Sequence, residues 1–86
     1  MKEIRWNLLK SERLKKTRGV SFEDIIKAKL IAIKRHHKKE NQNIILFEYK
    51  HYIWVVPYVE DKHYIFLKTI YPGRKYTRIY KKGDLK

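Results

Sequence analysis

The sequence predicts an α+β fold in which two N-terminal helices pack on one face of a four-stranded, or slightly larger, antiparallel β-sheet. Helix-start signals and apolar residues three and four positions apart occupy the first third of the chain. Segments rich in β-branched and aromatic residues follow, with connections short enough to require hairpins. Because the helices precede the strands rather than alternating with them, they are expected to cover one face of the sheet.

The 86 residues have room for one hydrophobic core, so we expect a single domain over 1–86. With 43% hydrophobic and 36% charged residues, the chain is too apolar for disorder and too often interrupted by charge for a membrane protein. Cysteine is absent, which excludes a disulfide framework and a cysteine-based zinc site.

The first predicted elements are a short strand at residues 2–6 and a helix from about Leu8 to Thr17. Asn7 is placed to cap this helix, because its side chain can accept a hydrogen bond from a backbone N–H of the first turn. Gly19 is placed to end it, because glycine readily adopts the left-handed conformation that follows many helices.

A second helix is predicted to begin at Ser21, with Asp24 completing an imperfect capping box in which aspartate replaces the usual glutamate. Phe22, Ile25 and Ile26 then recur at helical spacing and form a stripe that faces the core.

From about residue 29 the hydrophobic pattern changes to period two, which predicts a strand over residues 29–35 and a loop over residues 36–42. Three further strands are predicted at residues 43–50, 52–59 and 63–71. The strand at 52–59 is apolar on both faces and is therefore expected to be central, with Pro57 at a bulge or strand end. Pro72-Gly73 makes a final turn into a basic tail, for which helix and extended chain both stay open.

The charge of the chain is +13 and is concentrated at its two ends. Residues 1–37 carry eleven cations and four anions, residues 38–67 four of each, and residues 68–86 seven cations and one anion. Because such a surplus repels itself, it favours an anionic partner, most simply RNA; a solubilising surface is the alternative. No signal peptide or membrane-spanning run is recognisable, so we expect a cytoplasmic protein without membrane contacts.

No phosphate-binding glycine loop, nucleophile elbow or metal-ligand motif occurs, so neither a metal nor a cofactor is expected. Cations that neutralise phosphates instead alternate with rings on which unpaired bases can stack. They are Lys68, Tyr71, Arg74, Lys75, Tyr76, Arg78, Tyr80, Lys81 and Lys82. Tyr64, Phe66 and Tyr71 fit a role in the core better, whereas Tyr76 and Tyr80, which lie between charges, fit a functional role.

Metal-free cleavage of RNA requires a group that takes the proton of the 2′-hydroxyl, cations that stabilise the phosphorane, and an acid for the leaving oxygen. Arg74 and Lys68 supply suitable cations, and Tyr80 a hydroxyl. The histidines have a suitable unperturbed pKa, although each fits a solvated turn better than a catalytic role. They are His36, His37, His51 and His63.

Three motifs resemble those of a known family: Trp6-Asn7-x-x-Lys10, the segment from Arg18 to Asp24, and Gly73-Arg74-Lys75-x-Thr77. The chain is similar to the BrnT toxins of type II toxin–antitoxin systems, which are compact relatives of RelE-type ribonucleases. It departs from their pattern where Arg18 stands for a histidine, Pro72 for a serine and Tyr80 for an acid.

The resemblance implies a toxin that is a metal-independent endoribonuclease, with Arg74, Lys75 and Thr77 in its site. The pattern of charges and rings, rather than the resemblance, adds Tyr76, Arg78, Lys81 and Lys82 as residues that bind the RNA. The resemblance also implies a cognate antitoxin with an acidic covering part and a ribbon-helix-helix segment, so that operator DNA is contacted only through the complex. Two alternatives stay open. One is a non-catalytic RNA- or DNA-binding module, and the other a protein whose basic face binds only an acidic protein.

Overall fold

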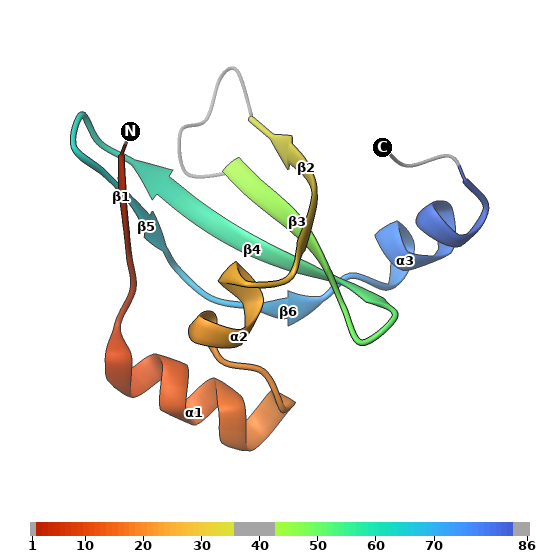
Figure 1. Ribbon diagram of the computed structural model, residues 1–86, viewed down its shortest axis with the longest axis horizontal. Coiled ribbons are helices and arrows are strands. Elements are labelled where there is room, and N and C mark those ends of the chain that lie inside the picture. The colour runs from red at the N-terminus through yellow and green to blue at the C-terminus, as the bar shows by residue number, and fades with distance from the viewer. Residues whose placement is uncertain (1, 36–42, 84–86) are drawn as a thin grey trace.

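The computed structural model describes residues 2–35 and 43–83, which form an α+β domain with one open sheet (Figure 1). The predicted loop at 36–42 lies outside the described residues. The sheet order is β1-β5-β4-β3-β2, with β6 also paired to β4. The elements are β1 (Glu3–Arg5), α1 (Leu8–Arg18), α2 (Phe22–Ile26), β2 (Lys29–Lys34), β3 (Asn43–Tyr49), β4 (Tyr52–Glu60), β5 (Tyr64–Leu67), β6 (Tyr71–Pro72) and α3 (Arg74–Lys81).

The sheet is mixed, which corrects the expectation of a purely antiparallel one. β1 pairs with β5 in parallel, with Glu3 opposite Tyr64 and Arg5 opposite Phe66. A hairpin cannot join two parallel strands, and here the chain between β1 and β5 contains both N-terminal helices and three strands. The period-two pattern indicated the strands but carried no information on the direction of this pairing.

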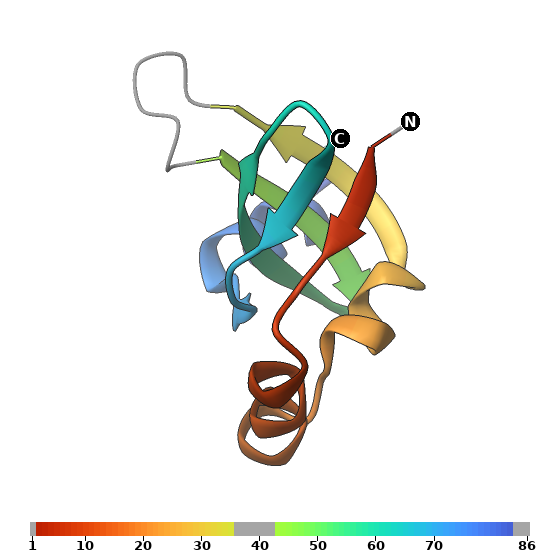
Figure 2. The same ribbon diagram turned by 90° about the vertical axis from the view of Figure 1, so that its left-hand side faces the viewer.

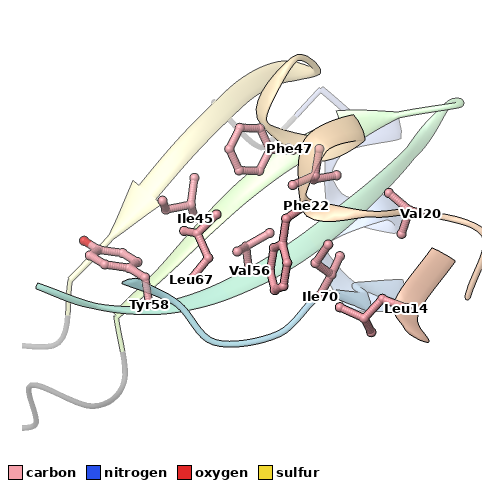
Figure 3. Close-up of a cluster of buried hydrophobic side chains, with 10 residues drawn as sticks. Leu14, Val20, Phe22, Ile45, Phe47, Val56, Tyr58, Leu67 and Ile70 are labelled. Carbon is pink, nitrogen blue, oxygen red and sulfur yellow. The ribbon is translucent and has the colours of Figure 1, made fainter. Parts of the chain in front are cut away.

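The helices lie on both faces of the sheet, which corrects the predicted two-helix, one-face arrangement. On one face, α1 and α2 contribute Leu14, Phe22 and Ile25 to the larger core cluster, together with sheet residues such as Val56 and Leu67 (Figure 3). On the other face α3, for which the sequence left helix or extended chain open, covers the second cluster of Leu46, Ile53 and Val55. In Figure 2, α3 (blue) lies to the left of and behind the strands, α2 (orange) lies to their right, and α1 lies below them.

The caps predicted for the N-terminal helices are confirmed. The Asn7 side chain accepts from the Lys10 N–H, and Gly19 ends α1 in the left-handed conformation with φ 78°. Ser21 and Asp24 form a reciprocal capping box at α2 despite the shorter acid.

The predicted strand at residues 63–71 is two strands, β5 and β6, because Pro57 interrupts the ladder between them. The Lys68 N–H donates to the Pro57 carbonyl at 2.8 Å, but Pro57 has no N–H with which to return the bond. Pairing with β4 therefore stops after Leu67 and resumes at Tyr71. Pro57 itself lies inside β4, which is central as predicted.

A bulge in β2 breaks the alternation predicted for residues 29–35. Leu30 pairs with Phe47 and Ala32 with Leu46, so one extra residue is inserted on the β2 side. As a result Leu30 and Ile33, the latter paired with Ile45, point to the same face, that of α1 and α2. None of the described helices is long and apolar enough to cross a membrane.

Candidate nucleic-acid interface

We call the side of the sheet that carries Leu46, Ile53, Val55 and the helix α3 the α3 face. The helix approaches this face closely at its N-cap, Gly73. A Cβ atom on Gly73 would lie 2.8 Å from Val55 Cγ2, so only glycine fits here without displacing the buried Val55 side chain. The Gly73 N–H donates to the Ile53 carbonyl at 2.9 Å, which fixes the start of α3 against the beginning of β4.

Thr77 anchors the next turn of α3. Its Oγ1 accepts from the Ile53 N–H at 2.9 Å and donates to the Gly73 carbonyl at 2.7 Å. The side chain is only 6% exposed, so it cannot contact a bound RNA as the sequence predicted. The hydroxyl has a structural function, because it satisfies a backbone donor that neither neighbouring strand reaches.

Tyr76 and Tyr80 form the apolar stripe of α3 and pack on the cluster of Leu46, Ile53 and Val55. The Tyr80 hydroxyl donates to Glu48 Oε1 at 3.0 Å. Both rings are half-buried, so their main role is to hold α3 on the sheet. The Tyr80–Glu48 hydrogen bond is the polar end of this contact.

The outer side of α3 is cationic and contains no acid. Within residues 2–35 and 43–83, no ion pair includes any of its cations, and all are exposed. They are Arg74, Lys75, Arg78, Lys81 and the capping Lys82. Two of them stand in the first turn, where the positive end of the helix dipole makes a cation unfavourable. The helix therefore keeps exposed cations at a cost to its own stability.

A strip of aromatic and basic side chains continues this surface along β5. The sequence predicted a functional role for its lysine, Lys68, but a core role for its rings. Tyr64 and Phe66 are half-buried and alternate with Ile65 and Leu67, which point to the opposite face and its larger core cluster. The bond from Lys68 N–H to Pro57 extends the register by one pair and puts Lys68 on the α3 face as well. The alternation of rings at 64 and 66 with aliphatic residues at 65 and 67 indicates that the rings face away from the larger core cluster. The prediction of a core role for these rings did not use this alternation.

Tyr71 joins the same face. It pairs with Val55, and directly opposed residues of antiparallel strands point to the same side. Its side chain is 41% exposed, so the expectation of a core role is wrong for Tyr71. At the far end of the strip, the Arg5 guanidinium lies 4.7 Å from the centre of the Tyr64 ring in a cation–π contact.

Charge on the α3 face is strongly one-sided. Lys29 and Lys34 of β2 pair with Glu48 and Ile44, which places both lysines on this face. With Lys68, Arg5 and the five cations of α3 and its cap, nine cations of the described residues lie here. The acids on the face are Glu48, bonded to Tyr80, and Glu3, which pairs with Arg5 at 2.7 Å.

The predicted catalytic residues Arg74, Lys68 and Tyr80 share the α3 face, but they do not form a connected cluster. Arg74 and Lys68 are exposed, and no hydrogen bond among the described residues joins either of them to Tyr80. His51 and His63 stand just before and just after β4, roughly 25–30 Å apart at the rise of a strand, so they cannot share a site. His36 and His37 lie outside the described residues.

The N-terminal motif residues build a structural network between α1 and α2. Glu23 accepts from Ser11 Oγ at 2.5 Å and from Trp6 Nε1 at 3.1 Å, and these bonds, led by that of Ser11, lower the Glu23 pKa. Asp24 binds Lys15 at 2.7 Å, which is the main reason that its pKa falls to about 2. Trp6 and the segment around Ser21 therefore stabilise the fold on the side opposite α3.

Fold and surface together define a small, strongly basic α+β domain with cations and aromatic rings gathered on one face of its sheet. Comparison of the chain with protein-family models, with curated proteins and with solved structures finds no match.

Proposed function

We propose that this protein binds single-stranded RNA across the α3 face. The observation that carries the proposal is the outward alternation of Tyr64, Phe66 and Lys68 along β5, on the same side as the cations of α3. The cations neutralise backbone phosphates, and the rings of Tyr64, Phe66 and Tyr71 offer surfaces for bases.

Single strands suit this surface better than duplexes. Rings on a sheet can stack only with bases that are unpaired and splayed, whereas an A-form helix presents phosphates and 2′-hydroxyls along a shallow groove. A duplex would use the cations and leave the rings without a partner. We therefore expect single-stranded RNA to bind more tightly than a duplex of equal phosphate number.

The test compares two matched double variants by fluorescence anisotropy with a labelled single-stranded RNA. Arg78→Gln/Lys81→Gln removes two exposed cations from α3, and Arg13→Gln/Lys16→Gln removes the same residue types at the same spacing from α1. The α3 variant is expected to bind about 10- to 30-fold more weakly at 0.1 M salt, with a salt slope smaller by about 1.4. Equal losses in both variants would contradict a binding surface on α3.

A second candidate function is metal-independent cleavage of RNA by a toxin that a cognate antitoxin inhibits. The observation that favours it is the Glu48–Tyr80 pair, a carboxylate and a phenol joined at 3.0 Å within a cationic face. In this scheme Glu48 accepts the proton of the 2′-hydroxyl, and Arg74 and Lys68 stabilise the charge on the phosphorane. The Tyr80 hydroxyl gives a proton to the leaving 5′-oxygen and is reprotonated by Glu48. The resemblance to BrnT toxins supports the same reading.

Cleavage is tested by incubating RNA with the protein in EDTA and examining the fragments for 2′,3′-cyclic phosphate ends. Wild-type protein is expected to cleave, and Arg74→Ala and Glu48→Gln are expected to lose activity while keeping the fold. Intact RNA with wild-type protein, both free and on ribosomes, would leave RNA binding without catalysis as the function.

A further inference from the structure

β2 is an edge strand whose outer side is free among the described residues. The strand order ends at β2, which pairs only with β3. Such an edge presents a row of unpaired N–H and C=O groups along its length, and an extended segment of another chain can add to it.

The two faces of β2 differ sharply in chemistry. On the α1 and α2 side the bulge brings Leu30 and Ile33 together, and these side chains are 53% and 50% exposed. On the α3 face β2 carries the exposed lysines Lys29 and Lys34. Residues 25–35 contain four cations and no acid.

An added strand points its own side chains alternately to these two faces. Aliphatic residues on one side would cover Leu30 and Ile33, and acidic residues on the other would meet Lys29 and Lys34. The complement of β2 is therefore an extended segment in which aliphatic and acidic residues alternate.

A second copy of β2 fits this edge poorly. Pairing two copies would bring lysines of one chain against lysines of the other. Like charges across an interface oppose association, whereas opposite charges favour the correct partner. Lys29 and Lys34 thus select against self-association and for an acidic partner.

The other end of the sheet lacks these features. β1 has three residues, and its Glu3 and Arg5 are already paired with each other at 2.7 Å. Ile4 is the one aliphatic side chain that β1 exposes, at 47%. β2, with six residues, is the longer and chemically more selective edge.

We propose that the β2 edge binds an extended segment of a partner protein in which aliphatic and acidic residues alternate. Lys29 and Lys34 border both this site and the RNA surface of the α3 face, but the edge proposal does not depend on RNA binding. If the second candidate function holds, such a segment is the covering part that its antitoxin would use.

The probe is a fluorescent peptide of about eight residues with alternating valine and glutamate, since strands usually have about five or six. The control peptide has the same composition with its valines and glutamates in two blocks. Wild-type protein is expected to bind the alternating peptide at least fivefold more tightly, with slowed hydrogen exchange at the amides of β2. Equal binding of both peptides, or slowed exchange at β1 instead, would overturn the proposal.

Two matched variants separate strand addition from general attraction to a basic protein. Lys29→Glu/Lys34→Glu reverses two charges on β2, and Lys81→Glu/Lys82→Glu makes the same net change on α3. The β2 variant is expected to bind the peptide at least tenfold more weakly than the α3 variant. Equal losses would overturn the proposal.

The variant Leu30→Ser/Ile33→Ser changes no charge and tests the aliphatic side of the edge. It is expected to lower peptide affinity at least fivefold and to change RNA affinity less than twofold, with circular dichroism confirming the fold. If this variant binds the peptide as tightly as wild type does, the edge site is wrong, whatever its RNA affinity. RNA binding on α3 is tested separately, with the α3 variants.

Discussion

At the scale of single residues, the side chains that hold α3 on the sheet are chemically distinct from those that it displays. Thr77 uses its hydroxyl twice, as acceptor for the Ile53 N–H and as donor to the Gly73 carbonyl. Tyr76 and Tyr80 supply the apolar contact. The cations of α3 take no part in this attachment and stay exposed.

Thr77→Val, which keeps the shape and removes the hydroxyl, is expected to lower the free energy of unfolding by about 1–3 kcal/mol, because the buried Ile53 N–H loses its acceptor. Urea denaturation measures the change. Thr17→Val is the matched control, since Thr17 also donates to the carbonyl four residues earlier but is exposed. Equal effects at both positions would contradict the anchoring role of Thr77.

Asp24 makes the stability of the α1–α2 side sensitive to acid. Its pKa is about 2 in the folded protein, below the ordinary 3.8, chiefly because of the hydrogen bond from Lys15. The stabilisation is therefore complete above the ordinary pKa and is lost as pH falls through about 2. We expect Asp24→Asn to reduce the fall in melting temperature between about pH 5 and pH 2. A pH profile identical to wild type, with the exposed Glu12→Gln as control, would refute this account.

The sequence predicted best the roles of residues whose partners lie within a few positions along the chain. The Ser21–Asp24 box and the Asn7 and Gly19 caps depend on local backbone geometry, and all three are present. The roles of the tyrosines depend on which face of the sheet each one meets. Tyr71 is exposed and Tyr76 packs on the sheet, the reverse of the predicted roles, because charged neighbours along the chain do not reveal that face.

At the scale of elements, α3 combines a well-fixed inner side with an unfavourable charge distribution. Arg74 and Lys75 occupy the first turn, where acidic residues are favoured, and no acid stands beside them. A bound phosphate chain would relieve this repulsion. The arrangement therefore favours ligand binding over the stability of the free helix.

Arg74→Glu is accordingly expected to move stability and binding in opposite directions. The free energy of unfolding should rise by about 0.3–1 kcal/mol, because an acid at the start of a helix interacts favourably with its dipole. RNA affinity should fall, because a phosphate-binding cation is replaced by an anion. Urea denaturation and RNA titration of the same variant test both signs, and a fall in stability would refute the dipole argument.

Two features of the sheet show what patterns along the chain do and do not predict. The segments rich in alternating and β-branched residues predicted the bounds of β3 and β4 to within one residue. Pro57 was also expected to disturb the pairing of β4 with its neighbour. The parallel β1–β5 pair and the position of α3 on the far face follow from long-range contacts. Such contacts leave no periodic signal within either partner.

At the scale of the whole molecule, the net charge of +13 on 86 residues makes self-repulsion a general cost of folding. Moderate salt is expected to raise the melting temperature by screening this repulsion. A single-stranded polyanion should raise it further at low salt, because a ligand that binds the native state stabilises it. Melting curves with sodium chloride or with RNA measure both effects, and destabilisation by salt would contradict the charge argument.

Photo-crosslinking of a uridine-rich single strand to the wild-type protein shows directly whether RNA lies on the α3 face. Mass spectrometry of the crosslinked peptides is expected to place the RNA between residues 64 and 82, with Tyr64, Phe66 or Tyr71 among the modified side chains. Crosslinks confined to α1, which packs on the opposite face of the sheet from α3, would contradict binding on the α3 face.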